Sequence, residues 1–233
     1  MGLIRFENVL KEYKVGKGSV KAVDHISFDI DEGKLTVILG PSGSGKSTTL
    51  NLLGGMDRAT SGSIMIDGSD ITKYSSHQLT YYRRGDVGFV FQFYNLIPTL
   101  NAFENVDVSR KLGKEPMDTY DALKAVGLEK RSKHFPSSMS GGELQRVSIA
   151  RAICKNPKVL LCDEPTGALD SETGRKVLQL LQKMSWEQNK TVIIVTHNAA
   201  IAEAADKVIR MKDGHVVEEK VNENPIPMEK VVW

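Results

Sequence analysis

The residues best suited to chemistry in this chain form a glycine-rich run that ends in a lysine and a serine. The run reads Gly40-Pro41-Ser42-Gly43-Ser44-Gly45-Lys46-Ser47, and Thr48 follows it. Glycines let the backbone curl so that successive N–H groups and a helix N-terminus face one anion. Lys46 would bring a positive charge to terminal phosphates, and the Ser47 hydroxyl is an oxygen ligand of the kind that Mg²⁺ prefers. This spacing predicts a phosphate-binding loop.

A second glycine pair opens another predicted helix far along the chain. Ser140-Gly141-Gly142-Glu143 precedes an amphipathic pattern that ends at Ile153, before Pro157. A serine and glycines at a helix N-terminus make a second phosphate site. Because one nucleotide held by the phosphate loop does not need another such site in the same domain, the spare site indicates the nucleotide of a partner chain. The alternative is an ordinary serine N-cap with glycine in the entering turn.

Two adjacent carboxylates end an apolar run that has the length of a buried strand. Val159–Cys162 leads directly into Asp163 and Glu164. Asp163 can hold the water shell of Mg²⁺, and Glu164 can polarise an attacking water as a general base. Two solvated acids at a strand end are the alternative. Their position, one short turn after the helix that Ser140 opens, favours the catalytic interpretation.

Together, these three motifs resemble the Walker A, signature and Walker B sequences of an ABC ATPase, from residue 3 to about residue 217. The resemblance implies a P-loop NTPase that uses ATP and Mg²⁺, with Lys46, Glu164 and His197 in catalysis. It also implies Mg²⁺ contacts from Ser47, Gln92 and Asp163. It further implies that the nucleotide contacts the glutamine that follows a strand, the signature residues, an aspartate of the segment called the D-loop in this family, and an aromatic ring that stacks on adenine. In the same order, these are Gln92; Ser140, Gly141, Gly142 and Glu143; Asp170; and Tyr13.

The signature departs from the usual pattern at two positions, where Met139 replaces leucine and Glu143 replaces glutamine. We still expect activity. Several stretches resemble the ATPases of macrolide-export, lipoprotein-release and antimicrobial-peptide-resistance systems, namely 52–57, 87–92, 94–98 and 164–171. The resemblance implies a separate integral-membrane permease as partner and a head-to-tail homodimer around two ATP molecules. A heterodimer with a related ATPase stays open, and the transported substrate is not encoded in this chain.

Rival classes of nucleotide-binding protein fit the sequence less well. A GTPase would need an N-K-x-D motif, but Asn189-Lys190 is followed by Thr191-Val192. A DNA-repair ABC ATPase would carry a long coiled-coil insertion before Ser140, and a ribosomal one would carry two cassettes in one chain. A degenerate ATP sensor would lack a catalytic residue, whereas the expected lysine, glutamate and histidine are all present. A soluble ABC ATPase that is not coupled to transport remains the alternative function.

The elements that must position these motifs alternate between strands and helices. This alternation predicts an α/β fold with a parallel sheet covered on both faces, and the resemblance implies a RecA-like core, an antiparallel β subdomain and an inserted α-helical subdomain. We expect one ABC domain over 1–233, with the core and β subdomain in 1–92 and 157–217, the helical subdomain in about 93–156, and a tail over 218–233. Predicted strands cover 3–9, 26–30, 35–39, 64–67, 87–91, 159–162 and 192–195, with a hairpin over 209–211 and 215–217. Predicted helices cover 45–53, 140–153, 177–184 and 199–205.

Composition sets the remaining expectations. Lysine and arginine number 31 against 29 acidic residues, which does not favour bulk binding to nucleic acid or to a membrane surface. Cys154 and Cys162 lack metal-ligand spacing and are expected to be buried thiols of a reducing compartment. Without a spanning run or a leader, we expect a cytoplasmic protein, held peripherally at the inner face of the membrane through its permease. The apolar stretch 93–100 could be a permease contact or part of the subdomain core.

Overall fold

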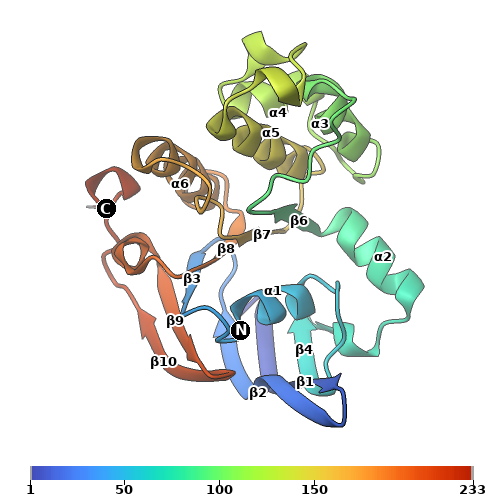
Figure 1. Cartoon of the computed structure of the whole chain (residues 1–233), viewed down its shortest axis with the longest axis vertical. Coiled ribbons are helices and arrows are strands. Elements are labelled where there is room, and N and C mark those ends of the chain that lie inside the picture. The colour runs from blue at the N-terminus through green and yellow to red at the C-terminus, as the bar shows by residue number, and fades with distance from the viewer. Residues whose placement is uncertain (1, 232–233) are drawn as a thin grey trace.

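Two β-sheets form the lower part of the molecule, and a group of helices lies above them (Figure 1). The structure is a computed structural model that describes residues 2–231. The first sheet is antiparallel, with strand order β2-β1-β4-β5. Its strands are β1 (Ile4–Val15), β2 (Gly18–Ile30), β4 (Ser61–Ile66) and β5 (Ser69–Asp70). β1 and β2 extend well beyond the predicted 3–9 and 26–30, because their outer ends pair as a mostly exposed hairpin that has no apolar alternation to reveal it.

The second sheet has six strands in the order β10-β9-β3-β8-β7-β6. They are β3 (Leu35–Leu39), β6 (Val87–Val90), β7 (Val159–Asp163), β8 (Thr191–Thr196), β9 (Lys207–Lys212) and β10 (His215–Val221). All neighbours are parallel except β9 and β10, which form the predicted hairpin. The predicted parallel sheet is confirmed, with one antiparallel edge strand. β10 continues to Val221, past residue 218 where we expected the tail to begin.

The central strand β3 shows why both faces of this sheet must be covered. Leu35, Val37 and Leu39 point into one hydrophobic cluster, which also contains residues of the upper helices and of α6 (Ser171–Trp186). Ile38 points into the other cluster, with residues of α1 (Lys46–Leu53) and of the antiparallel sheet. A strand that is buried on both faces needs a nearly continuous apolar run, and this strand is apolar except at Thr36, which is also buried.

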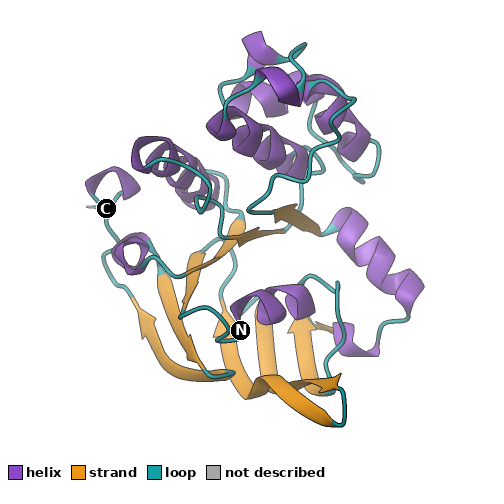
Figure 2. Ribbon diagram, in the orientation of Figure 1, coloured by secondary structure: helices purple, strands orange, loops and turns teal. Residues whose placement is uncertain are grey.

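The upper helices are α3 (Ala102–Arg110), α4 (Thr119–Ala125) and α5 (Gly141–Ile153), grouped at the top of Figure 2. α2 (Ser76–Gly85), at the edge of the sheet, was not predicted, although Ser75 and Gln78 form a capping box at its start. The helix predicted over 199–205 is wrong in type. Residues Ala199–Ala204 form a 3₁₀ helix that buries Ile201 and Ala204, a spacing of three that suits three residues per turn.

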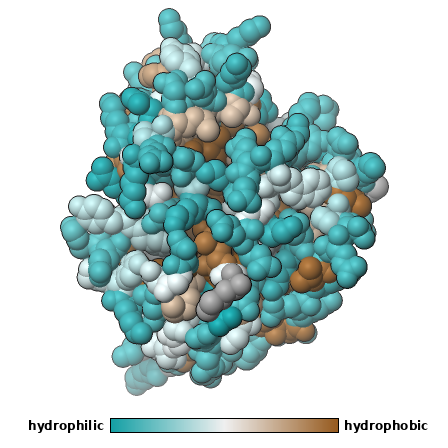
Figure 3. All heavy atoms as spheres, turned by 180° about the vertical axis from the view of Figure 1, so that it is seen from behind, coloured by the Kyte–Doolittle hydropathy of each residue, from teal (hydrophilic) through white to brown (hydrophobic). Residues whose placement is uncertain are grey.

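The segment after β10 returns to α6. Met228 and Val231 are buried, and the Met228 N–H donates to Gln182 Oε1 at 2.8 Å. Residues 232–233 of the expected tail lie outside the described residues. Of the helices in residues 2–231, none combines the length and apolar character that a bilayer-spanning segment requires. Seen from behind, the surface is largely hydrophilic, with hydrophobic side chains showing in patches along its middle (Figure 3).

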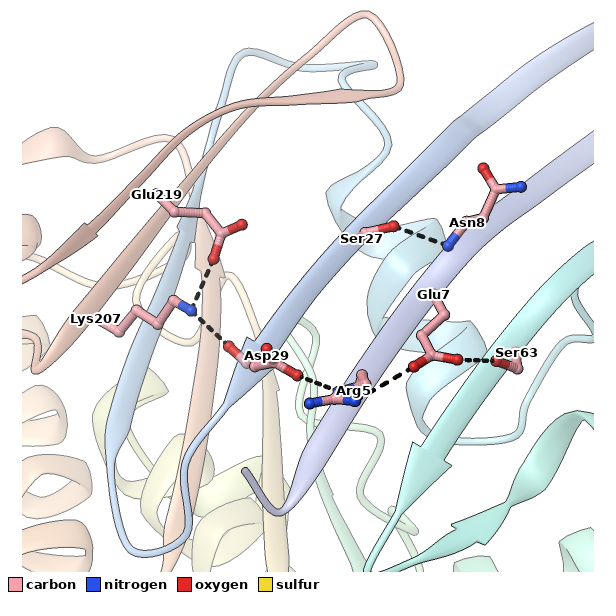
Figure 4. A network of polar contacts seen from close by, with 8 residues as sticks. All are labelled: Arg5, Glu7, Asn8, Ser27, Asp29, Ser63, Lys207 and Glu219. Atoms are coloured by element: carbon pink, nitrogen blue, oxygen red, sulfur yellow. Dashed lines mark hydrogen bonds and ion pairs between the residues drawn. The ribbon is translucent and has the colours of Figure 1, made fainter. Parts of the chain in front are cut away.

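A polar network joins the two sheets where they meet (Figure 4). Lys207 of β9 donates to the Asp29 carbonyl of β2 and pairs with Glu219 of β10, both at 2.7 Å. Arg5 of β1 donates to the Asp29 carboxylate of β2 at 2.8 Å and to Glu7 of its own strand at 3.5 Å. Lys207 is the most buried of these charged side chains, and its two contacts join β9 and β10 to β2.

Candidate active site

The glycine-rich run forms a loop between β3 and α1, as predicted. Gly43 and Gly45 have φ values of +79° and +98°, which turn successive N–H groups to one side. Gly45 caps α1 without a side-chain hydrogen bond, so the first turn keeps N–H groups available for an anion. A Cβ on Gly45 would lie 2.3 Å from the Ala22 carbonyl oxygen, and one on Gly40 would lie 2.2 Å from that of Met211. Neighbouring strands therefore require glycine at both places.

The Lys46 ammonium lies inside this loop. The residue is 7% exposed, and Nζ donates to the carbonyl oxygens of Gly40 at 2.7 Å and Pro41 at 2.9 Å. Burial lowers the pKa of Lys46, while the negative charges of Glu164 and Asp163 oppose that change. The loop thus presents a cation, held at a fixed place by its own carbonyls, to any phosphate that enters.

The two carboxylates lie opposite the loop, at the end of β7. Ser47 Oγ donates to Asp163 Oδ1 at 3.1 Å, and burial raises the pKa of Asp163. Glu164 adopts a left-handed φ of +45°, which is uncommon for a residue with a side chain. Its two oxygens are each engaged, Oε2 by the Thr196 hydroxyl at 3.1 Å and Oε1 by His197 Nδ1 at 3.0 Å. The end of β8 thereby fixes the orientation of the Glu164 carboxylate.

These groups line one cavity of about 840 Å³. The predicted residues that line it are Pro41, Ser42, Gly43, Ser44, Gly45, Lys46, Ser47, Thr48, Gln92, Asp163, Glu164 and His197. Ala22 also lines it and was not predicted, because it reaches the loop only through the path of β2, which leaves no mark in the sequence. The cavity therefore joins the loop, both carboxylates and the histidine that follows β8.

Other predicted site residues lie outside this cavity. Gly40 lies just behind it, where it accepts the Lys46 hydrogen bond. The Tyr13 hydroxyl donates to Asp57 Oδ2 at 2.6 Å. Asp170 caps α6, accepting from the Thr173 N–H at 3.0 Å. Ser140, Gly141, Gly142 and Glu143 stand at the start of α5, in the helical group. One chain therefore holds a phosphate loop with its carboxylates and, separately, the second glycine site.

The second glycine site is built as a capping box. Ser140 Oγ accepts from the Glu143 N–H at 3.3 Å, and Glu143 Oε2 accepts from the Ser140 N–H at 2.9 Å. Glu143 Oε1 accepts from Arg131 Nε at 2.8 Å. The Ser140 N–H and the Arg131 guanidinium both hold the pKa of Glu143 down. Arg131 was missed by the sequence analysis, and it offsets the charge that distinguishes Glu143 from the usual glutamine.

The donor set in the cavity fits ATP and Mg²⁺. Ser47, Asp163 and Gln92 offer oxygen atoms, which are the ligands that Mg²⁺ takes. Ser44 is 2% exposed, and its Oγ has no hydrogen-bond partner among residues 2–231, so a phosphate oxygen would satisfy it. The free N–H groups of α1 and the Lys46 ammonium complete a site for a polyphosphate.

Comparisons with known protein families and sequences find several relatives of this chain. The sequence profile of the family described as ABC transporter matches residues 23–167. An uncharacterised ABC transporter ATP-binding protein of Methanocaldococcus jannaschii, MJ0796, is 44% identical over 227 residues, covering 94% of this chain and 97% of that protein. The macrolide export ATP-binding/permease protein MacB of Brucella melitensis is 43% identical over 220 residues, covering 92% of this chain and 34% of that protein.

Solved structures show the same likeness. The dimeric cassette MJ0796, in a post-hydrolysis state bound to ADP and Pi, matches with a TM-score of 0.87 and 41% identity, covering 95% of this chain and 99% of that one. The cbiO1 protein of Clostridium perfringens, part of the ABC transporter complex cbiONQ, matches with a TM-score of 0.83 and 32% identity, covering 94% of this chain and 88% of that one.

Proposed function

This chain belongs to the ABC transporter family, and we propose that it is the ATP-hydrolysing subunit that drives a separate membrane-spanning permease. The observation that carries the proposal is the single cavity that joins the phosphate loop, both carboxylates and His197. Binding ATP alone would not require a glutamate whose carboxylate is oriented by Thr196 and His197 beside the phosphate loop, whereas hydrolysis requires a general base there. The alternative function is a soluble ABC ATPase that is not coupled to transport.

In the proposed reaction, Glu164 acts as the general base. The loop N–H groups and Lys46 hold the phosphates, and Thr196 and His197 hold the Glu164 carboxylate. A water oxygen attacks the γ-phosphorus, Glu164 accepts the proton of that water, and the bond to the β–γ bridging oxygen breaks to leave ADP and phosphate. Mg²⁺, held by Ser47, Gln92 and Asp163, would supply positive charge that offsets the charge of the phosphates.

The second glycine site suggests how two chains cooperate. We assign Ser140, Gly141 and Gly142 of each protomer, together with Asp170, to the nucleotide held by its partner's phosphate loop. This arrangement gives an anion to the Gly141 and Gly142 N–H groups at the start of α5, which the capping box does not use. The relative MJ0796 forms a dimer, which supports a head-to-tail homodimer. A heterodimer with a related ATPase would use the same surfaces.

The permease contact is assigned to the segment after Gln92. Phe93 is 77% exposed and Ile97 is 42% exposed, whereas Leu96 packs against the core of the helical group. Leu96 thus contributes to core packing, and the exposed Phe93 and Ile97 are the side chains that we propose for the permease contact. MacB joins ATPase and permease in one protein, and cbiO1 is part of a transporter complex. By analogy, this chain would sit in the cytoplasm, peripheral to the inner face of the membrane.

Three measurements test this function. Wild-type protein should hydrolyse ATP in the presence of Mg²⁺, while Glu164→Gln should lose about two to four orders of magnitude in turnover, the contribution of a general base. With ATP on a sizing column, Glu164→Gln should elute as a dimer, whereas Lys46→Ala should remain a monomer. A Glu164→Gln chain that stays monomeric at saturating Mg-ATP would refute the symmetric dimer. Failure of the tagged chain to purify with any integral-membrane protein would favour the soluble alternative.

A further inference from the structure

We propose that Asp57 and Lys11 are positioning residues that hold the Tyr13 ring ready for the adenine base. The inference rests on the proposed function, within which Tyr13 stacks on the base. Neither Asp57 nor Lys11 lines the phosphate cavity. Both act through the tyrosine, so their effect should depend on whether the ligand has a base.

Asp57 joins the other two side chains. Its Oδ2 accepts from the Tyr13 hydroxyl at 2.6 Å, and its Oδ1 accepts from Lys11 Nζ at 2.6 Å. Lys11 Nζ also donates to the Arg58 carbonyl oxygen at 2.9 Å. Both carboxylate oxygens and the ammonium are thus engaged, and the tyrosine is tied at its hydroxyl. Hydrogen bonds to a charged group are the stronger kind, so they can restrain a side chain near the surface.

Lys11 also restrains the ring from one side. Its Nζ lies 4.7 Å from the centroid of the Tyr13 ring, in a cation–π arrangement. Tyr13 is 38% exposed, so an unrestrained ring would sample several orientations. With Lys11 over one face and Asp57 on the hydroxyl, the other face is the one that we assign to the base.

Asp57 is itself linked to α1, the helix that follows the phosphate loop. α1 begins beside the phosphate loop, and the chain turns back after it, with the Met56 and Asp57 N–H groups both donating to the Asn51 carbonyl oxygen at 2.9 and 3.3 Å. Thr48, in the first turn of the same helix, lines the cavity. One short helix therefore sets both the phosphate site and the position of the aromatic ring.

Restraint of the Tyr13 ring should affect the affinity of some ligands and not of others. A ring fixed before binding loses little freedom when the base arrives, which is how preorganisation raises affinity. Removing the restraint should weaken ligands that contain adenine and leave the phosphate contacts unchanged. If Asp57 or Lys11 served only the fold, all ligands would weaken together.

The experiment compares ADP with pyrophosphate, which has no base, by isothermal titration calorimetry in the presence of Mg²⁺. The variants are Tyr13→Phe, which keeps the ring and removes its hydroxyl, Asp57→Ala, and the double variant. Each single change should raise the Kd for ADP about three- to tenfold, the value of one ordinary hydrogen bond, and leave the Kd for pyrophosphate within twofold. The double variant should be no weaker than Asp57→Ala alone, because both changes remove the same contact.

Asp67→Ala is the matched control, because Asp67 also pairs with a lysine, Lys158, away from the cavity. It should change neither Kd. Lys11→Met should raise the Kd for ADP and leave the Kd for pyrophosphate unchanged. This second variant keeps the test valid if Asp57→Ala does not fold. Equal loss of ADP and pyrophosphate, additive effects in the double variant, or an unchanged Kd for ADP would each overturn the inference. A wild-type chain that binds neither ligand would instead overturn the proposed function.

Discussion

Replacing Arg131 with alanine should weaken the ATP-dependent dimer, because it exposes the charge of Glu143. Arg131 Nε and Glu143 Oε1 lie 2.8 Å apart, and the two side chains are 44% and 13% exposed. As a source of stability, a pair this exposed contributes little. Its proposed role is electrostatic, because Glu143 stands where the family carries a neutral glutamine, at the helix start that we assign to the partner's nucleotide.

The size of the effect follows from Coulomb's law. A carboxylate roughly 10 Å from a nucleotide with about two net negative charges is repelled by about 1–2 kcal/mol in an effective dielectric of about 40. That is roughly a tenfold loss of ATP affinity at each site, before screening by salt. Because the Debye length is about 10 Å at 0.1 M ionic strength, the loss should grow as salt is lowered. Glu143 stays ionised in this variant, since the Ser140 N–H still holds its pKa down.

The assay is the dimer fraction of Glu164→Gln protein on a sizing column as ATP is titrated, with and without the second change. Arg131→Ala should raise the ATP concentration needed for half-maximal dimer about tenfold. Arg131→Ala with Glu143→Gln should restore it, because the neutral amide needs no counter-charge. Lys130→Ala is the matched control, since it removes the same charge one residue away and keeps the pair. The reasoning is refuted if the double change stays as weak as Arg131→Ala, or if Lys130→Ala has the same effect.

Three further changes test other parts of the structure. Phe93→Glu should abolish stimulation of ATP turnover by the permease and leave basal turnover unchanged, because the side chain is 77% exposed; preserved stimulation would place the contact elsewhere. Gly142→Ala should lower the free energy of unfolding by about 1–3 kcal/mol, since its Cβ would lie 2.1 Å from Thr173 Cγ2, and Thr173→Ser should relieve that loss in thermal unfolding; no relief would mean that the clash is not the cause. Burial lowers the pKa of Lys155 to about 8 in the folded state, against 10.5 in the unfolded chain. Between about pH 8 and 10.5 the unfolded chain thus binds the extra proton, so stability should rise with pH by up to about 3 kcal/mol. Urea unfolding should show this rise against Lys155→Met, and parallel pH profiles for the two proteins would contradict it.

The sequence was most informative where chemistry restricts residue type. The loop from Gly40 to Ser47 needs glycines, a lysine and a serine at fixed spacing, so its place between a strand and a helix followed directly. Continuous apolar runs such as Val192–Val195 predicted strands that are buried on both faces, and the parallel sheet confirmed them. Polar elements were the ones missed. α2 has few apolar residues, and the outer half of the β1–β2 hairpin is exposed, so neither has a hydrophobic pattern.

The sequence by itself determined which residues we propose for the chemistry. Lys46, Asp163 and Glu164 belong to short motifs whose spacing is local, and His197 was assigned from its order after those motifs along the chain. Only the tertiary structure decided which groups orient and balance them. Thr196 on the Glu164 carboxylate, Arg131 on Glu143, and Asp57 on Tyr13 are contacts between segments that lie 12 to 44 residues apart in the chain. Such pairs depend on how strands and helices are packed, and residue spacing alone does not record that packing.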